Sequence, residues 1–73
     1  MLKADGFDKA IVGIGRRCGQ PDLLVYDVHE CINILIERDG MTEEQAMEYF
    51  DFNVVGSWVG ESTPIFLYTG EEY

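Results

Sequence analysis

The chain has 73 residues, of which 47% are hydrophobic, and its 14 acidic and five basic side chains give a net charge of −9. This length fits one domain, residues 1–73, and the apolar content is sufficient for a core, which excludes an acidic disordered tail. The charge repels nucleic-acid phosphate and anionic lipid, and no apolar run approaches the roughly 18–20 residues that span a bilayer. Neither nucleic acid nor a membrane is therefore an expected partner.

Three apolar runs predict β-strands, at residues 10–14, 23–26 and 65–68. The first two runs are separated by a glycine-rich stretch, residues 15–22, which is typical of a loop. The third run follows Pro64, and proline is tolerated at the first position of a strand. The terminal segments, residues 1–6 and 69–73, are expected to fray.

Two helices are predicted between the second and third strands. Asp27 stands at the N-cap of the first helix and Gly40 ends it, since glycine adopts the left-handed conformation there without steric cost. Its apolar residues recur at helical spacing: Val28, Cys31, Ile32, Leu35 and Ile36. Thr42 and Gln45 form a capping box at the start of the second helix, and Gly56 is its expected stop. The inward stripe of this helix is predicted to be Ala46, Tyr49, Phe50 and Val54.

The element order β-β-α-α-β predicts an α+β fold, with a three-stranded sheet covered on one face by an αα-hairpin. The order of the strands in the sheet cannot be derived from the sequence. Phe52 and Trp58 are expected to pack in the core at the end of the second helix, with exposure for a partner as the alternative. The predicted buried set is Val28, Cys31, Ile32, Leu35, Ile36, Ala46, Phe50, Ile65 and Leu67.

Three strings of the sequence together cover most of the chain. They are Asp5-Gly6-Phe7, CGQPDLLVYD at residues 18–27, and residues 39–66, which begin DGMT and contain EYFDFNVVGSWVGESTPIF. In these strings the chain resembles a family of small uncharacterised proteins encoded by bacteriophages and bacteria. The family carries no established activity, ligand or catalytic residue, so the resemblance implies a phage-like origin only.

Three carboxylates recur at helical spacing on the second predicted helix: Glu44, Glu48 and Asp51 at positions i, i+4 and i+7. Like charges at this spacing repel by about 0.2–0.5 kcal/mol per pair, and no lysine is interleaved to relieve them. Residues 37–73 hold nine acids and a single base. This pattern predicts a partner-binding face for a basic protein surface, with a merely solvated helix face as the alternative.

Two of the five cations, Arg16 and Arg17, lie together in the glycine-rich loop Gly15–Gln20. Guanidinium groups beside free backbone N–H groups can hold a phosphate or a carboxylate, so a small-molecule or nucleotide site is a second hypothesis. The competing expectation is that both arginines pair with the chain's own surplus of acids. The loop lacks a third glycine where Cys18 stands and a helix that begins at this turn, which argues against a dinucleotide-binding fingerprint.

Cys18 and His29 are the only thiol and imidazole that could form a nucleophile and base, because Cys31 lies on the apolar stripe of the first helix. His29 is expected on the polar side of that helix, which disfavours a Cys18-dependent enzyme. The spacing fits no metal site, and no cofactor is expected. With no secretory leader before Asp5, a cytoplasmic location with reduced thiols is predicted.

The leading functional hypothesis is a non-enzymatic interaction or inhibitor protein. Its partner would be a protein with a basic surface, in particular a nucleic-acid-handling or defence protein in the cytoplasm of a host cell. The chain is small enough for its core to supply only about 3–5 kcal/mol, so a homodimer is also left open.

Overall fold

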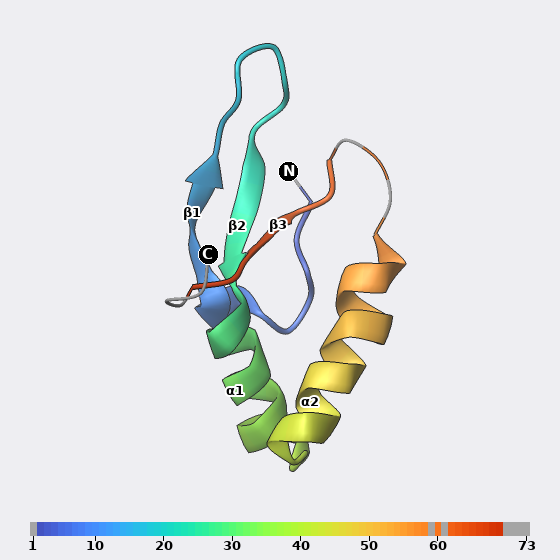
Figure 1. Ribbon diagram of the computed structural model, residues 1–73. Helices are drawn as coiled ribbons and strands as arrows, with labels where there is room; N and C mark the ends of the chain where they lie inside the picture. The colour runs from blue at the N-terminus through green and yellow to red at the C-terminus, as the bar shows by residue number, and fades with distance from the viewer. Residues whose placement is uncertain (1, 59, 61, 70–73) are drawn as a thin grey trace.

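The computed structural model describes residues 2–58, 60 and 62–69, and the chain has the predicted α+β fold (Figure 1). A three-stranded sheet has the spatial order β1-β2-β3. Within the described residues, no helix has both the length and the apolar character that crossing a bilayer requires. The elements along the chain are η1 (Asp8–Ala10), β1 (Ile11–Gly15), β2 (Leu23–Asp27), α1 (Val28–Asp39), α2 (Glu43–Tyr49), η2 (Phe50–Val54), η3 (Val55–Ser57) and β3 (Ile65–Leu67).

The sheet is mixed, with β2 at its centre. β1 pairs with β2 antiparallel, with an irregularity between Ile11 and Gly13, and β3 pairs with β2 in parallel. A parallel pairing needs a long crossover connection, and here the two helices supply it. α1 continues directly from β2, and α2 then runs back toward the sheet (Figure 1). The helical hairpin is therefore the link that places β3 beside β2.

The face of β3 that packs against the core is the one that the sequence predicts to be exposed. Ile65 and Leu67 were expected to be buried, but they are 39% and 41% exposed, and Phe66 between them packs against the core. Side chains alternate between the two faces of a strand, so a wrong choice of face moves both flanking residues to the surface. Phe66 pairs with Tyr26 in the parallel register, and their ring centroids lie 5.9 Å apart.

The helix caps agree with the sequence. The Asp27 carboxylate accepts a hydrogen bond of 3.0 Å from the His29 backbone N–H, and Gly40 ends α1 in the left-handed conformation with a φ of 67°. Thr42 and Gln45 form the predicted capping box at the start of α2. The core face of α1 consists of Val28, Cys31 and Leu35, with Ile32 and Ile36 half-buried beside them.

The second helical arm, defined here as residues 43–57, changes its winding along its length. It begins as the α-helix α2, passes through a π-helical turn at Phe50–Val54, and finishes as the short 3₁₀-helix Val55–Ser57, one residue beyond the predicted stop. A π-helix has more residues per turn than an α-helix, so Phe50 and Val54 lie almost directly above one another, and both are buried.

Tyr49, predicted on the inward stripe of this arm, is 41% exposed. Consecutive residues of a helix are rotated by about 100°, so the face that buries Phe50 turns its neighbour Tyr49 toward solvent.

Aromatic side chains join the arm, the sheet and the N-terminal segment. The ring of Phe50 meets Phe66 of β3 edge to face at 5.5 Å, and it meets Phe7 at 6.2 Å in the same manner. The hydroxyl of the fully buried Tyr26 accepts a 2.8 Å hydrogen bond from the Ala4 backbone N–H. Ala4 is thus buried within a segment for which fraying was expected, whereas residues 70–73 of the other terminus lie outside the described residues.

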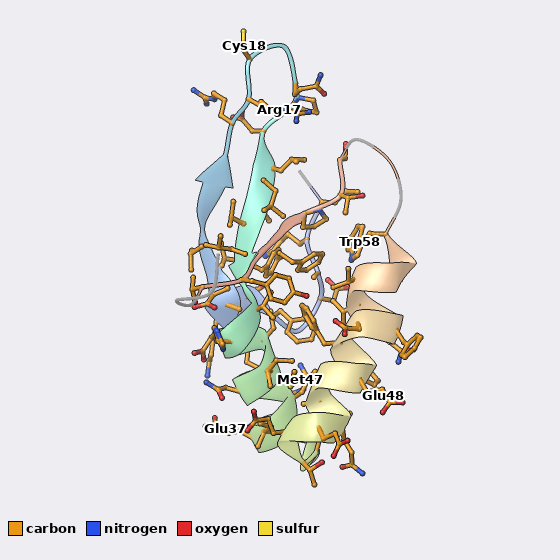
Figure 2. The ribbon with its side chains drawn as sticks, viewed as in Figure 1. Arg17, Cys18, Glu37, Met47, Glu48 and Trp58 are labelled. Carbon is orange, nitrogen blue, oxygen red and sulfur yellow. The ribbon has the colours of Figure 1, made fainter. Side chains whose placement is uncertain are left out.

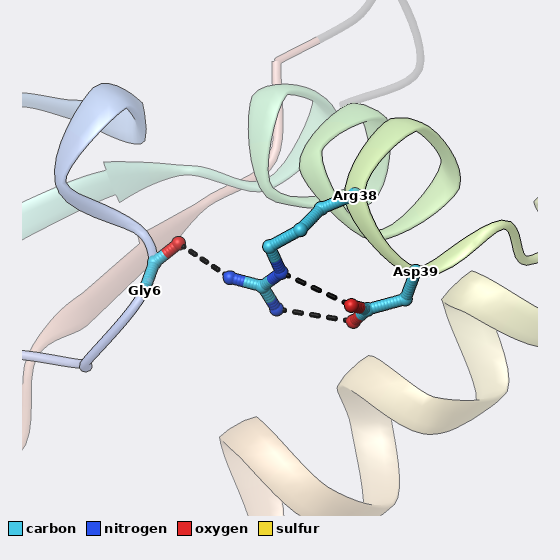
Figure 3. Close-up of polar contacts among 3 residues, drawn as sticks. All are labelled: Gly6, Arg38 and Asp39. Atoms are coloured by element: carbon cyan, nitrogen blue, oxygen red, sulfur yellow. Dashed lines mark hydrogen bonds and ion pairs between the residues drawn. The ribbon is translucent and has the colours of Figure 1, made fainter.

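Arg38 fastens the N-terminal segment to the end of α1 (Figure 3). Its Nη1 donates to the carbonyl oxygen of Gly6 at 3.0 Å, and its Nε and Nη2 donate to the two carboxylate oxygens of Asp39 at 3.2 and 3.1 Å. The guanidinium carbon also lies 5.5 Å from the centroid of Phe7. Hydrogen bonding from Arg38 lowers the pKa of the Asp39 carboxyl. One exposed cation therefore neutralises its neighbour and covers a core aromatic ring.

Truncation of Leu35, which is fully buried at the centre of α1, should destabilise the protein severely. Leu35→Ala is expected to cost about 2–5 kcal/mol of unfolding free energy, because it removes buried methyl groups and leaves a cavity. Leu67→Ala, the same change at a position 41% exposed, is the matched control and should cost far less. Urea unfolding of both variants measures the difference, and equal losses would contradict the assignment of the core.

Candidate functional site

The second helical arm carries an unrelieved negative charge. Its acidic residues are Glu43, Glu44, Glu48 and Asp51, and residues 43–57 include no lysine or arginine. All four carboxylates are exposed. None of them takes part in the ion pairs formed within the described part of the chain, which are Lys3–Asp8, Arg16–Asp22 and Arg38–Asp39.

The three carboxylates predicted as one stripe are all exposed, but they do not border one hollow. Asp51 borders a groove between α1 and α2, whereas Glu48 borders a separate depression on the outer side of the arm. Figure 2 shows this divergence, with Met47 directed toward α1 and Glu48 directed away from it. Helical spacing accounts for the divergence, because Asp51 lies four residues after Met47 on the same face, whereas Glu48 is rotated from Met47 by about 100°.

The groove between α1 and α2 is about 350 Å³ in volume and is mainly apolar. Its lining includes Val28, Ile32, Ile36, Met47 and Phe50, and the carboxylates of Glu43 and Asp51 stand on the side of the second arm. Met47 is 52% exposed, so a large, flexible apolar side chain borders the groove and is open to solvent. Sequence reasoning missed this groove, although Glu43, Met47 and Phe50 share a helix face at spacings of four and three residues.

The segment after β3 forms one end of the groove. Tyr68 lines it, and burial raises the pKa of the Tyr68 phenol, with a further contribution from the nearby Asp51 carboxylate. His29, at the start of α1, donates a 2.7 Å hydrogen bond from Nε2 to the Thr69 carbonyl oxygen. A carbonyl oxygen only accepts, so this contact assigns the proton to Nε2. His29 thus holds the segment that borders the groove.

The outer side of the arm also exposes aromatic surface. Phe52, expected in the core, is 75% exposed and lines a depression together with Met41 and Tyr49. Trp58, the other aromatic residue expected there, is half-buried and packs against the core as predicted. Phe52 lies two residues after Phe50 in the π-helical turn, so burial of Phe50 directs Phe52 to the opposite side.

The loop between β1 and β2 contains both predicted arginines. Its tip is a turn closed by a 3.0 Å hydrogen bond from the Gln20 N–H to the Arg17 carbonyl oxygen, and Gly19 supplies the φ of 78° that a type II turn requires. Arg16 donates to both carboxylate oxygens of Asp22 at 2.9 Å, which lowers the pKa of Asp22. The expected ion pair with one of the chain's own acidic side chains therefore forms at Arg16. No ion pair of Arg17 is found among the described residues.

The structure separates the thiol and imidazole groups. Cys18 is exposed at the tip of the hairpin loop, and His29 follows the opposite end of β2, a strand that alone spans about 13 Å. Cys31 is buried, as predicted, and desolvation raises the pKa of its thiol to about 12. No cluster of metal-ligating side chains is present among the residues that the structure describes.

The described surface offers three means of recognition: carboxylates and exposed apolar side chains on the second arm, and guanidinium groups at the hairpin loop. No family model, curated protein or solved structure matches the chain. The site is therefore derived from the geometry of this chain alone.

The two thiols should differ strongly in reactivity. Cys18 should react quickly with a thiol reagent in the native protein, while Cys31 should react only after unfolding, because the thiolate is the nucleophile and a pKa of about 12 keeps Cys31 protonated at neutral pH. Mass spectrometry after timed labelling at neutral pH measures both rates, with the denatured protein as the reference. Comparable rates in the native protein would show that α1 is packed differently.

Proposed function

We propose that the protein is a non-enzymatic interaction protein that binds a basic, amphipathic segment of a protein partner through its second helical arm. The observation that carries the proposal is the composition of this surface: four exposed carboxylates, no cation, and the large exposed apolar side chains of Met47, Tyr49 and Phe52. Charge and apolar surface on one element suit a partner with lysine or arginine beside apolar residues.

Electrostatics supports a basic partner in two ways. The net charge of −9 attracts a basic surface at long range, and the four carboxylates concentrate part of that charge on one short arm. Their mutual repulsion is relieved when a partner supplies the missing cations. Such charges contribute to the association rate and to the choice of partner more than to affinity.

Apolar contact supplies the affinity that exposed charges lack. In this proposal apolar side chains of the partner enter the groove beside Met47, while its basic side chains meet Glu43 and Asp51. An amphipathic helix that lays its apolar face in a groove between helices is a recurring mode of recognition. Methionine suits such contacts because its flexible side chain adapts to the shape of the partner.

The class of partner follows from its charge. Basic clefts are characteristic of proteins that hold nucleic acid, and an acidic surface can occupy such a cleft in place of phosphate. The phage-like origin implied by the resemblance makes a nucleic-acid-handling or defence protein of a host cell the partner class that we propose. Inhibition by occupation of the cleft requires no chemistry from this chain.

The test compares three immobilised proteins: the wild type and two triple variants that have the same net charge but lose their carboxylates at different places. The first is the wild type, and the second carries Glu43→Gln, Glu48→Gln and Asp51→Asn on the arm. The third is a matched control with Asp5→Asn, Glu30→Gln and Glu37→Gln, outside the arm, and both variants change the net charge from −9 to −6. The wild type and the control are expected to capture a stoichiometric partner from bacterial lysate. The arm variant is expected to lose this partner or to bind it more weakly.

Association kinetics with that partner then distinguish long-range electrostatic attraction from direct contact. The wild-type association rate should fall with added salt as the Debye length shrinks from about 10 Å at 0.1 M to 3 Å at 1 M, and the arm variant should associate more slowly with a shallower salt dependence. Equal rates and equal salt dependence for the two triple variants would mean that the arm serves solubility only. The proposal would then be abandoned.

A further inference from the structure

A depression at the far end of the sheet is separate from the second helical arm and carries the opposite charge. It lies between the β1–β2 hairpin loop and the segment that enters β3, and its volume is about 440 Å³. The residues that matter for recognition are Arg16, Arg17, Gln20, Leu23, Thr63 and Ile65. This size is within the range of about 300–1,000 Å³ that is usual for small-molecule sites.

The charge of this depression is opposite in sign to the net charge of the molecule. Two of the five basic residues line it, and no carboxylate does so among the described residues. Four other hollows of the described part of the chain are each bordered by at least one acid, namely Asp51, Glu30, Glu48 and Asp5, respectively. An anion that enters the depression beside the hairpin loop meets two arginine side chains and no carboxylate of the described lining.

The two guanidinium groups have different roles. Asp22 holds Arg16 through Nε and Nη2, which fixes the plane of the guanidinium and leaves the donors on Nη1. Arg17 begins the turn that Gln20 closes, so the backbone position of Arg17 is set by the same loop. Arg16 and Asp22 cancel in charge, and Arg17 supplies the net positive charge of the site.

The wall of the depression that the strands supply is apolar. Leu23 and Ile65 come from adjacent strands, and Gly15 lies beside them without a side chain. A Cβ atom at Gly15 would lie only 2.7 Å from Cδ1 of Ile65, so the absence of a side chain allows Ile65 to pack over the strand. An apolar wall next to arginine donors suits a ligand with an anionic group at one end and an organic ring at the other.

We propose that this depression binds a small phosphate monoester, such as a nucleoside monophosphate. The phosphate accepts hydrogen bonds from Arg17, from Nη1 of Arg16 and from the side-chain amide of Gln20. The organic group lies against Leu23 and Ile65. Arginine suits this role because its planar donors match phosphate oxygens and its charge persists at every physiological pH. The site is independent of the proposed partner-binding arm.

The test is a titration of ¹⁵N-labelled protein with inorganic phosphate and with adenosine 5′-monophosphate, followed by NMR. Saturable shifts are expected at residues 15–23 and 62–65 with both probes, with tighter binding of the nucleotide, and adenosine alone should bind more weakly than the nucleotide. Arg17→Gln should weaken nucleotide binding by about tenfold or more, the loss that corresponds to one charge-assisted hydrogen bond. Lys9→Gln makes the same charge change outside the depression and should leave binding unchanged.

Three results would overturn the proposal. The first is the absence of shifts at these residues with either probe at millimolar concentration. The second is equal weakening by Arg17→Gln and Lys9→Gln, which would indicate general electrostatic attraction. The third is adenosine binding as tightly as the nucleotide, which would leave no role for the phosphate. Because none of these variants touches the second arm, failure here leaves the proposed function unaffected.

Discussion

The ring of Phe50 is the contact on which the arrangement of this small protein depends. It is almost fully buried, and its edge-to-face contacts reach Phe66 of β3 and Phe7 of the N-terminal segment. Each such aromatic pair contributes about 0.5–1.5 kcal/mol beyond the burial of area, which is substantial for a domain of this size. One side chain thus joins the helical arm, the sheet and the chain's beginning.

Burial of Phe50 also decides what the second arm exposes. Once this residue faces the core, the helical winding turns Tyr49 and Phe52 to the outer side and leaves Met47 over the groove beside α1. The carboxylates occupy the positions between them. The mixed acidic and apolar surface is therefore a consequence of how the arm is anchored, and this surface is the basis of the proposed partner binding.

Arg17 and the start of the second helical arm lie toward opposite ends of the molecule. The hairpin loop with Arg17 lies at one end, and the turn between α1 and α2 lies at the other, near Glu37 and Glu48 (Figure 2). Three of the five cations are used in pairs with Asp8, Asp22 and Asp39, all outside the second arm. The arm consequently keeps its full negative charge, which can orient an approaching basic partner before contact.

Local signals in the sequence predicted local structure well. The caps at Asp27 and Thr42 are present because a side chain and the adjacent backbone N–H groups are sufficient to form them, and Gly40 caps α1 because glycine adopts the left-handed backbone conformation without steric cost. The face of β3 was predicted wrongly, because alternation in a three-residue strand has two solutions and only the partner across the sheet selects one. The π-helical turn, the exposure of Phe52 and the groove were missed for the same reason, since each depends on packing between distant segments.

The arrangement of the candidate site could also be predicted only in part from the sequence. Glu44, Glu48 and Asp51 were predicted to be exposed, and they are, but Glu48 and Asp51 border two different hollows, and the groove beside Asp51 depends on the position of α1. The pairing of Arg16 with Asp22 was anticipated from composition, whereas the depression beside it is formed with residues near β3.

In the proposed complex, the second helical arm is the surface that meets the partner. Amide hydrogen exchange of the free protein and of its complex with the captured partner tests this most directly, because protection reports which backbone segments become covered or stabilised. We expect increased protection across residues 43–54 and on the side of α1 that borders the groove, with β1 and the hairpin loop unchanged. Protection confined to residues 11–27, with residues 43–54 unaltered, would contradict it.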